Sequence, residues 1–369
     1  MSQKIYFDNA ATTAPIEPDR ERIFGNPSSP HALGLGAERA LSLARAEMAS
    51  LFGGLVQEQA LAQARGLGKI IFTSGGTESN NLALIGYALA NKRKPPRIFA
   101  NAWEHPSVTA PIKFCEEQGF FVRAADMESA DIVSLSHVSH ETGDINDIAE
   151  TAAYLKAKNR AVIVHVDGVQ GFCKEKMDMR DVDMYSFSGH KIHGASVGGL
   201  FVREGLRLVP ILYGGGQEAG LRHGTENVNG ILQTVNAAKF LYQSREKFHA
   251  HVAQIRNELA QLANGADCVI NSRGDASPYI LNMSFLGING ETLVHLLSEK
   301  GVYASMGAAC KSRKKQKSML ELMGMDAERA RSAVRFSFSH MNTLEEARAA
   351  REIIIYAVGQ IKAITGKSI

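Results

Sequence analysis

A lysine that follows a strand-like segment is the first residue whose type and position suit chemistry. Lys191 ends the run Ser188-Gly189-His190-Lys191, behind the apolar segment 184–188. A lysine amine behind small and polar residues suits a Schiff base with a carbonyl compound. Taken alone, a lysine in a turn is more often a solvated charge. Lys191 alone therefore does not indicate a Schiff-base site, and a second residue of matching chemistry is needed.

An aspartate at the end of the preceding strand segment supplies that partner. Asp167 closes the apolar run 161–167, and ligands bind at the carboxyl ends of strands in open α/β sheets. Pyridoxal 5'-phosphate (PLP) needs an acid beside its pyridine nitrogen. The acid keeps that nitrogen protonated and the ring electron-withdrawing. Asp167 alone also fits an ordinary turn. An aspartate and a lysine that end successive strands form a much more specific pair.

A glycine-rich turn offers a place for the phosphate. Residues 74–77, Ser-Gly-Gly-Thr, join a predicted strand at 69–73 to a predicted helix at 77–92. Free backbone N–H groups at a helix start bind anions, and Gly76 lets the backbone approach a phosphate closely. A plain turn with Thr77 as the helix N-cap is the alternative.

The elements around these residues alternate between strand and helix patterns. Apolar periodicity predicts helices at 36–52, 77–92, 106–118 and 146–158, and strands at 69–73, 97–101, 120–124, 131–135, 161–167, 184–188 and 199–203. This alternation implies a parallel sheet with helices on both faces.

A long helical pattern at 226–263 leads into a second, smaller α+β domain. Its expected strands are 280–285 and 334–339, and its closing helix is 344–363. We expect a large domain at 15–255 and a small domain formed by 1–14 and 256–369. Residues 54–68 separate a helix from a strand that normally need a short link, so we expect a surface insertion there.

The composition is that of an ordinary globular protein. Of 369 residues, 45% are hydrophobic and 21% charged, and the net charge of +3 is too small to predict binding of nucleic acid or a membrane surface. We expect neither a signal peptide nor a membrane span. The four cysteines, Cys115, Cys173, Cys268 and Cys310, form no CxxC pair, which argues against a metal site or disulfide framework. A reducing cytoplasm is the expected location.

Together these motifs resemble the cysteine desulfurases, PLP-dependent class V aminotransferases of fold type I. The match runs nearly end to end, and its motifs lie at 6–13, 25–34, 72–81, 104–108, 165–170, 186–194, 214–228, 281–285, 306–312 and 334–339. The resemblance implies an α/β fold, with a mainly parallel seven-stranded sheet in the large domain and a smaller α+β domain.

The resemblance assigns roles around the cofactor ring. Lys191 matches the lysine that forms the Schiff base, and Asp167 matches the partner of the pyridinium nitrogen. Gln170 matches the donor to the phenolic oxygen. His105 matches a catalytic histidine that stacks on the ring and shuttles protons.

The resemblance also assigns the phosphate and substrate contacts. The residues that match the phosphate site are Gly76, Thr77, Ser188, His190 and Thr225. The threonine at the last of these positions reaches the neighbouring subunit's phosphate, so a homodimer is implied. Arg335 matches the arginine that holds the substrate carboxylate through two parallel hydrogen bonds.

Cys310 matches the sulfur-accepting nucleophile of the family. The implied enzyme converts L-cysteine to L-alanine: Lys191 removes the α-proton, and the Cys310 thiolate takes the substrate sulfur as a persulfide. The sulfur then passes to an acceptor protein for iron–sulfur cluster assembly or another thiolation. The stretch from Cys310 to Arg335 resembles the branch with a long catalytic loop.

Three stretches depart from the family pattern. His140 stands where the family usually has an asparagine near the substrate carboxylate, residues 193–198 lack the usual Pro-Lys, and residues 311–317 hold five basic side chains. We hypothesise that this basic cluster lowers the pKa of Cys310 and steers an acidic sulfur acceptor. A merely solvated loop is the alternative.

Other functions stay open at this point. A selenocysteine lyase on the same scaffold fits the same residues. The His140 change favours a weakly active PLP-binding paralogue that acts through a protein partner. Cys310 disfavours another PLP enzyme such as an aminotransferase, which needs no thiol.

Overall fold

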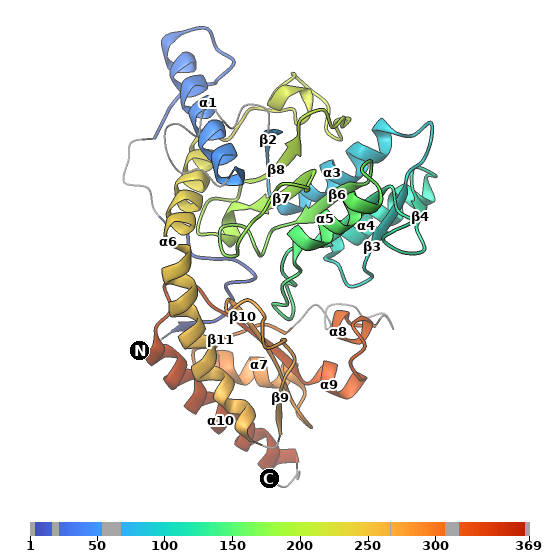
Figure 1. The fold of residues 1–369 in the computed structure, drawn as a ribbon. Coiled ribbons are helices and arrows are strands. Elements are labelled where there is room, and N and C mark those ends of the chain that lie inside the picture. The colour runs from blue at the N-terminus through green and yellow to red at the C-terminus, as the bar shows by residue number, and fades with distance from the viewer. Residues whose placement is uncertain (1–3, 17–21, 54–67, 266, 307–316, 366–369) are drawn as a thin grey trace. The chain divides into compact units, whose positions relative to one another are not determined.

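The computed structural model describes residues 4–16, 22–53, 68–265, 267–306 and 317–365 (Figure 1). The chain divides into a large unit, residues 14–137 and 146–244, and a small unit, residues 1–13, 138–145 and 245–369. The domain bounds expected from the sequence stay a prediction. The expected insertion at 54–68 lies outside the described residues, apart from Gly68. None of the helices in the described ranges combines the length and apolar composition that a membrane crossing needs.

The large unit contains a sheet of seven strands in the order β2-β8-β7-β6-β5-β3-β4. Its strands are β2 (Gly68–Thr73), β3 (Arg97–Ala100), β4 (Val122–Arg123), β5 (Ile132–Ser136), β6 (Ile163–Asp167), β7 (Met184–Ser188) and β8 (Gly198–Arg203). Only β8 runs antiparallel to its neighbours, β2 and β7. The predicted mainly parallel seven-stranded sheet is confirmed.

Helices cover both faces of this sheet, as the alternating pattern predicted. One apolar cluster joins the sheet to α1 (Ala32–Phe52), α5 (Ile148–Lys158) and the start of α6 (Val228–Ala260). Another joins the opposite face to α3 (Gly76–Ala90) and α4 (Pro106–Glu117). A strand buried on both faces reads as a near-continuous apolar run, which is why 161–167 was recognisable.

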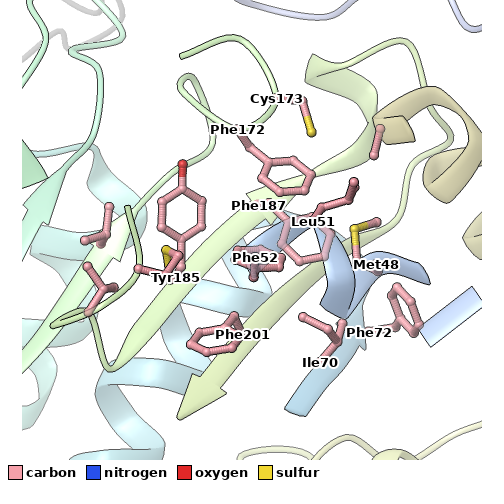
Figure 2. Packing of buried hydrophobic residues seen from close by; sticks show 14 of the residues in the cluster. Met48, Leu51, Phe52, Ile70, Phe72, Phe172, Cys173, Tyr185, Phe187 and Phe201 are labelled. Atoms are coloured by element: carbon pink, nitrogen blue, oxygen red, sulfur yellow. The ribbon is translucent and has the colours of Figure 1, made fainter. Parts of the chain in front are cut away.

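Alternation along β7 separates the polar residues from the core. Tyr185 and Phe187 point into the cluster under α1, where the Phe52 ring lies among Phe172, Tyr185, Phe187 and Phe201 at centroid distances of 5.1–5.8 Å (Figure 2). Because side chains alternate along a strand, Ser188 lies on the other face, toward α3. The same parity in β6 places Val166 in the core under α1 and Asp167 on the α3 face.

The small unit is an α+β structure with its own core. Its antiparallel sheet has the order β12-β10-β9, and β1 pairs in parallel with β11. The strands are β1 (Ile5–Tyr6), β9 (Cys268–Ile270), β10 (Ile280–Phe285), β11 (Val302–Tyr303) and β12 (Ala333–Ser337), and the helices are α7 (Gly290–Glu299), α8 (Met319–Leu322), α9 (Ala327–Arg331) and α10 (Leu344–Thr365). The predicted strands at 280–285 and 334–339 and the closing helix are confirmed.

Candidate active site

Asp167 is a buried carboxylate with both oxygens held. It ends β6 and is 6% exposed. Its Oδ2 accepts a hydrogen bond from Nδ2 of Asn80 at 2.9 Å, and its Oδ1 accepts from the backbone N–H of Val169 at 3.1 Å. Hydrogen bonds to the ionised form stabilise a buried charge. The carboxylate is therefore fixed in orientation, as a partner for a pyridinium nitrogen must be.

Lys191 lies at the same edge of the sheet, in the turn that follows the neighbouring strand. Strand β7 pairs in parallel with β6, and Asp167 stands opposite Ser186. The chain then makes a 3-10 turn, Gly189–Lys191, fixed by a hydrogen bond from the Gly189 N–H to the Val197 carbonyl at 2.6 Å. The aspartate thus ends β6, and the lysine lies in the turn directly after the adjacent parallel strand β7.

The start of α3 forms an anion cradle beside these two residues. Gly75 at the N-cap has no side chain to cap the first turn, so backbone N–H groups and the helix dipole are available to a ligand. A Cβ on Gly76 would lie 2.4 Å from Cγ2 of Val169, so only glycine fits there. The Ser188 hydroxyl oxygen is buried and has no hydrogen-bond partner among the described residues. The residues present therefore fit a phosphate group.

Two basic side chains near Lys191 have strongly lowered pKa values. Burial, together with the charges of Lys191 and Lys174, lowers the pKa of His190 to about 4. His190 is thus a neutral N–H donor at neutral pH. Burial, followed by the charge of Lys191, lowers the pKa of Lys174 to about 7. Sequence reasoning missed Lys174, because the run Gly171–Lys176 carries no sign that this lysine is buried.

The other residues assigned to the cofactor also lie in the large unit. His105 is the N-cap of α4, and its Nδ1 accepts a hydrogen bond from the Ser107 N–H at 3.1 Å. Gln170 is buried in the turn that follows Asp167. Thr225 is exposed and lines a cavity of about 240 Å³, together with Ser74.

Arg335 and His140 belong to the small unit. Arg335, on β12, is 7% exposed, and its Nη1 donates to the His140 carbonyl at 2.7 Å. Its Nη2 lies 3.3 Å from Oδ1 of Asp8. The Nε of Arg335 is buried and has no hydrogen-bond partner within the described ranges. The guanidinium is thus held in place, with its Nε–H among the donors left for a carboxylate. The contact that joins Arg335 to His140 is thus made by the His140 backbone carbonyl.

Two of the described cysteines, Cys115 and Cys268, are poor nucleophiles. Burial, aided by the charge of Glu116, raises the pKa of Cys115 to about 11, and burial raises the pKa of Cys268 to about 12. Both stay thiols at neutral pH, whereas the thiolate is the reactive form. Cys310 lies outside the described residues. Within the described ranges, no group of three or more His, Cys, Asp and Glu could hold a metal ion.

A buried acid close to Asp167 makes the stability of the fold depend on pH. Burial, and then the charge of Asp167, raises the pKa of Glu104 from 4.5 to about 7. The folded chain keeps a proton that the unfolded chain releases, so stability is lost as pH rises through this window. Between about pH 5 and about pH 8, the unfolding free energy of the wild type should fall by about 2–3 kcal/mol relative to Glu104→Gln.

Urea unfolding of the protein without added ligand, at the two pH values, measures this difference. Glu38→Gln, at an exposed site on α1, is the matched control and should follow the wild type. Parallel pH dependence in the wild type and Glu104→Gln would contradict the prediction.

Comparison with known proteins agrees with this geometry. The sequence model of the aminotransferase class V family matches residues 5–131 and 123–349. A NifS/IcsS protein homolog of Lactobacillus delbrueckii subsp. bulgaricus is 37% identical, with 93% of this chain and 94% of the relative covered. Cysteine desulfurase IscS 1 of Archaeoglobus fulgidus is 32% identical, with 98% of both chains covered. A solved NifS-like protein superposes with a TM-score of 0.83 at 30% identity, over 99% of this chain and 100% of that one.

The family model and the fold place the chain among the class V aminotransferases. With relatives at this identity over nearly its whole length, the chain belongs to the cysteine desulfurase family within that class, and it is an enzyme of this kind.

Proposed function

We propose that this cysteine desulfurase binds PLP in the large unit and moves the sulfur of L-cysteine to Cys310. The observation that carries the proposal is the pair of adjacent strand ends. A fixed, buried carboxylate, Asp167, ends β6, and Lys191 follows β7. The unpartnered Ser188 hydroxyl, at the end of β7 and beside the start of α3, adds a site for the phosphate.

Each residue has a distinct task in this proposal. When bound, PLP supplies an electron sink that eases loss of the α-proton. Asp167 keeps the pyridine nitrogen protonated, and Ser188 and the neutral His190 donate hydrogen bonds to the phosphate. Gln170 donates to the phenolic oxygen, and His105 covers the ring. Further contacts to the phosphate are assigned to Gly76, Thr77 and Thr225.

The sulfur transfer balances with Cys310 as the acceptor. Lys191 Nζ takes the α-proton of L-cysteine, and Arg335 binds the α-carboxylate through N–H donors that include its unpartnered Nε–H. The Cys310 thiolate attacks the substrate sulfur. The new S–S bond forms as the Cβ–S bond breaks, and the electron pair of that bond stays with the carbon skeleton. Cβ then takes up a proton and Lys191 returns the α-proton, so the products are alanine and a Cys310 persulfide.

The remaining parts of the proposal concern partners and location. Exposed apolar side chains of the large unit, among them Phe24 at 82% and Tyr213 at 74% exposure, support a homodimer because such groups favour burial against another chain. A sulfur-acceptor protein is expected to collect the persulfide, for iron–sulfur cluster assembly or another thiolation. A cytoplasmic location is our expectation from the scattered cysteines.

The test is turnover by the purified, PLP-loaded protein with L-cysteine and a reductant. We expect alanine and sulfide in equal amounts, and no turnover of L-aspartate. L-Selenocysteine is the matched substrate. Turnover of L-selenocysteine alone would identify a selenocysteine lyase instead. Absence of alanine from both substrates, with PLP bound, would overturn the proposal and favour a protein that acts through a partner.

A further inference from the structure

A continuous chain of hydrogen bonds joins Asp167 to His105 through two residues that have no role so far. Asn80 is fully buried, and its Nδ2 lies 2.9 Å from Oδ2 of Asp167 and 2.8 Å from Oγ of Ser107. Oγ of Ser107, which is 7% exposed, lies 2.7 Å from Nδ1 of His105. Two helices, α3 and α4, thus link the pyridine partner to the ring-covering histidine.

The donors along this chain can be ordered. The backbone N–H of Ser107 donates to Nδ1 of His105 at 3.1 Å, so Nδ1 is an acceptor and carries no proton. The Ser107 hydroxyl must then donate to the same nitrogen, while its oxygen accepts from Asn80. Asn80 spends its two amide hydrogens on Asp167 and Ser107. The proton of a neutral His105 ring is therefore on Nε2.

Asparagine suits the central position because it donates twice without adding charge. An aspartate there would place a second carboxylate against Asp167 and could not donate when ionised. The Oδ1 of Asn80 is also buried without a hydrogen-bond partner in the described part of the chain. Leaving a buried acceptor unsatisfied is destabilising, so packing alone does not account for this residue.

The local sequence explains how this chain of hydrogen bonds forms. His105, Pro106 and Ser107 form the N-cap and first turn of α4, with proline at the position that helix starts favour. This cap fixes both the His105 ring and the Ser107 hydroxyl. Asn80 lies one turn into α3, on the side that packs against α4 and the sheet.

We propose that Asn80 and Ser107 are positioning residues that hold the Asp167 carboxylate and fix His105 as its Nε2–H tautomer. This inference rests on the proposed function, because Asp167 and His105 act there on the cofactor. Through this hydrogen-bond chain, a change at Asn80 alters the hydrogen bonding of His105, although the two residues do not touch.

Nitrogen-15 NMR of the histidine side chains tests this coupling directly. Protein labelled with nitrogen-15 histidine would be compared with Asn80→Leu and Ser107→Ala, and His105→Gln would assign the signals. We expect an unprotonated Nδ1 and a protonated Nε2 in the wild type. The Nδ1 resonance should shift in Ser107→Ala, which lacks one of the two donors. It should also shift in Asn80→Leu, because the freed hydroxyl can turn away.

A double variant and a kinetic measurement complete the test. In the Ser107→Ala background, Asn80→Leu should cause no further shift of the His105 nitrogens. In turnover with L-cysteine, Asn80→Leu should lower kcat by about 10- to 100-fold, with little change in KM. Asn91→Leu, at the C-cap of the same helix, is the matched control and should leave the His105 shifts and kcat unchanged.

Unchanged nitrogen chemical shifts of His105 in both Ser107→Ala and Asn80→Leu would overturn the proposal that this hydrogen-bond chain fixes His105. If Asn80→Leu does not fold, an unchanged Nδ1 shift in Ser107→Ala alone overturns it, because that substitution removes only a hydroxyl. If the wild type makes no alanine from L-cysteine but the two variants still shift the His105 resonances, the proposed function is refuted and the coupling of Asn80 and Ser107 to His105 is retained.

Discussion

Replacing Lys191 by alanine is expected to lower alanine formation from L-cysteine by at least about 10³-fold, because it removes the amine that takes the α-proton. Lys191 follows β7, beside the strand that ends at Asp167. The other residues of its 3-10 turn, Gly189 and His190, carry no amine that could replace it. Steady-state alanine production, with the variant's PLP content measured in parallel, checks the loss.

A second lysine makes this experiment sharper. Lys174 is buried, and its pKa is lowered to about 7 by burial and the charge of Lys191. In Lys191→Ala the charge of Lys191 is gone, but burial, the larger cause, still lowers the pKa of Lys174 and so favours the neutral amine, which is the form that can act as a base. Any residual turnover in Lys191→Ala should disappear in Lys191→Ala/Lys174→Met.

The matched control for Lys191→Ala is Lys176→Ala, at an exposed site in the same segment. It should retain wild-type turnover. A Lys191→Ala variant that binds PLP and makes alanine within about tenfold of the wild-type rate would contradict the assignment of Lys191 as the base.

The sequence was sufficient to locate one half of the site. Asp167 and Lys191 each follow an apolar run, and the carboxyl ends of adjacent parallel strands meet at one edge of a sheet. The glycine turn before α3 was recognisable because glycines before a helical pattern have a known use. These features depend on residues that are close together in the sequence, so they can be recognised before the fold is known.

The sequence did not reveal contacts that depend on distant residues. Asn80 reads as an ordinary polar helix position, and only the folded chain brings it to Asp167, which lies 87 positions away. The burial of Lys174 depends on the elements packed around its turn. The antiparallel orientation of β8 was also hidden, because an apolar strand pattern carries no direction.

The small unit shows the same limit. Two of its strands, at 280–285 and 334–339, were predicted from the sequence. Arg335 sits among apolar residues there, and nothing local shows that Asp8 will lie 3.3 Å from it. Residues 138–145, far from 1–13 and 245–369 in sequence, also belong to this unit. Segments that join a domain through tertiary contacts leave no periodic pattern.

Replacing Cys310 by alanine is expected to lower sulfide release by at least about 10²-fold, while L-cysteine still changes the colour of the PLP-loaded protein. The reason is that sulfur transfer needs a thiolate. Among the described cysteines, burial raises the pKa of Cys115 to about 11 and that of Cys268 to about 12. Neither can take over the sulfur at neutral pH.

Intact-protein mass spectrometry after one turnover, without reductant, locates the sulfur. The wild type should gain one sulfur atom, and Cys310→Ala should gain none. Cys115→Ala and Cys268→Ala are matched controls, because each removes one thiol whose pKa burial raises well above neutral pH, and both should gain sulfur as the wild type does. Sulfur retained by Cys310→Ala and lost in one of the controls would place the nucleophile elsewhere. The raised pKa of that cysteine would then have to fall when substrate binds, which a pH profile of its alkylation would show.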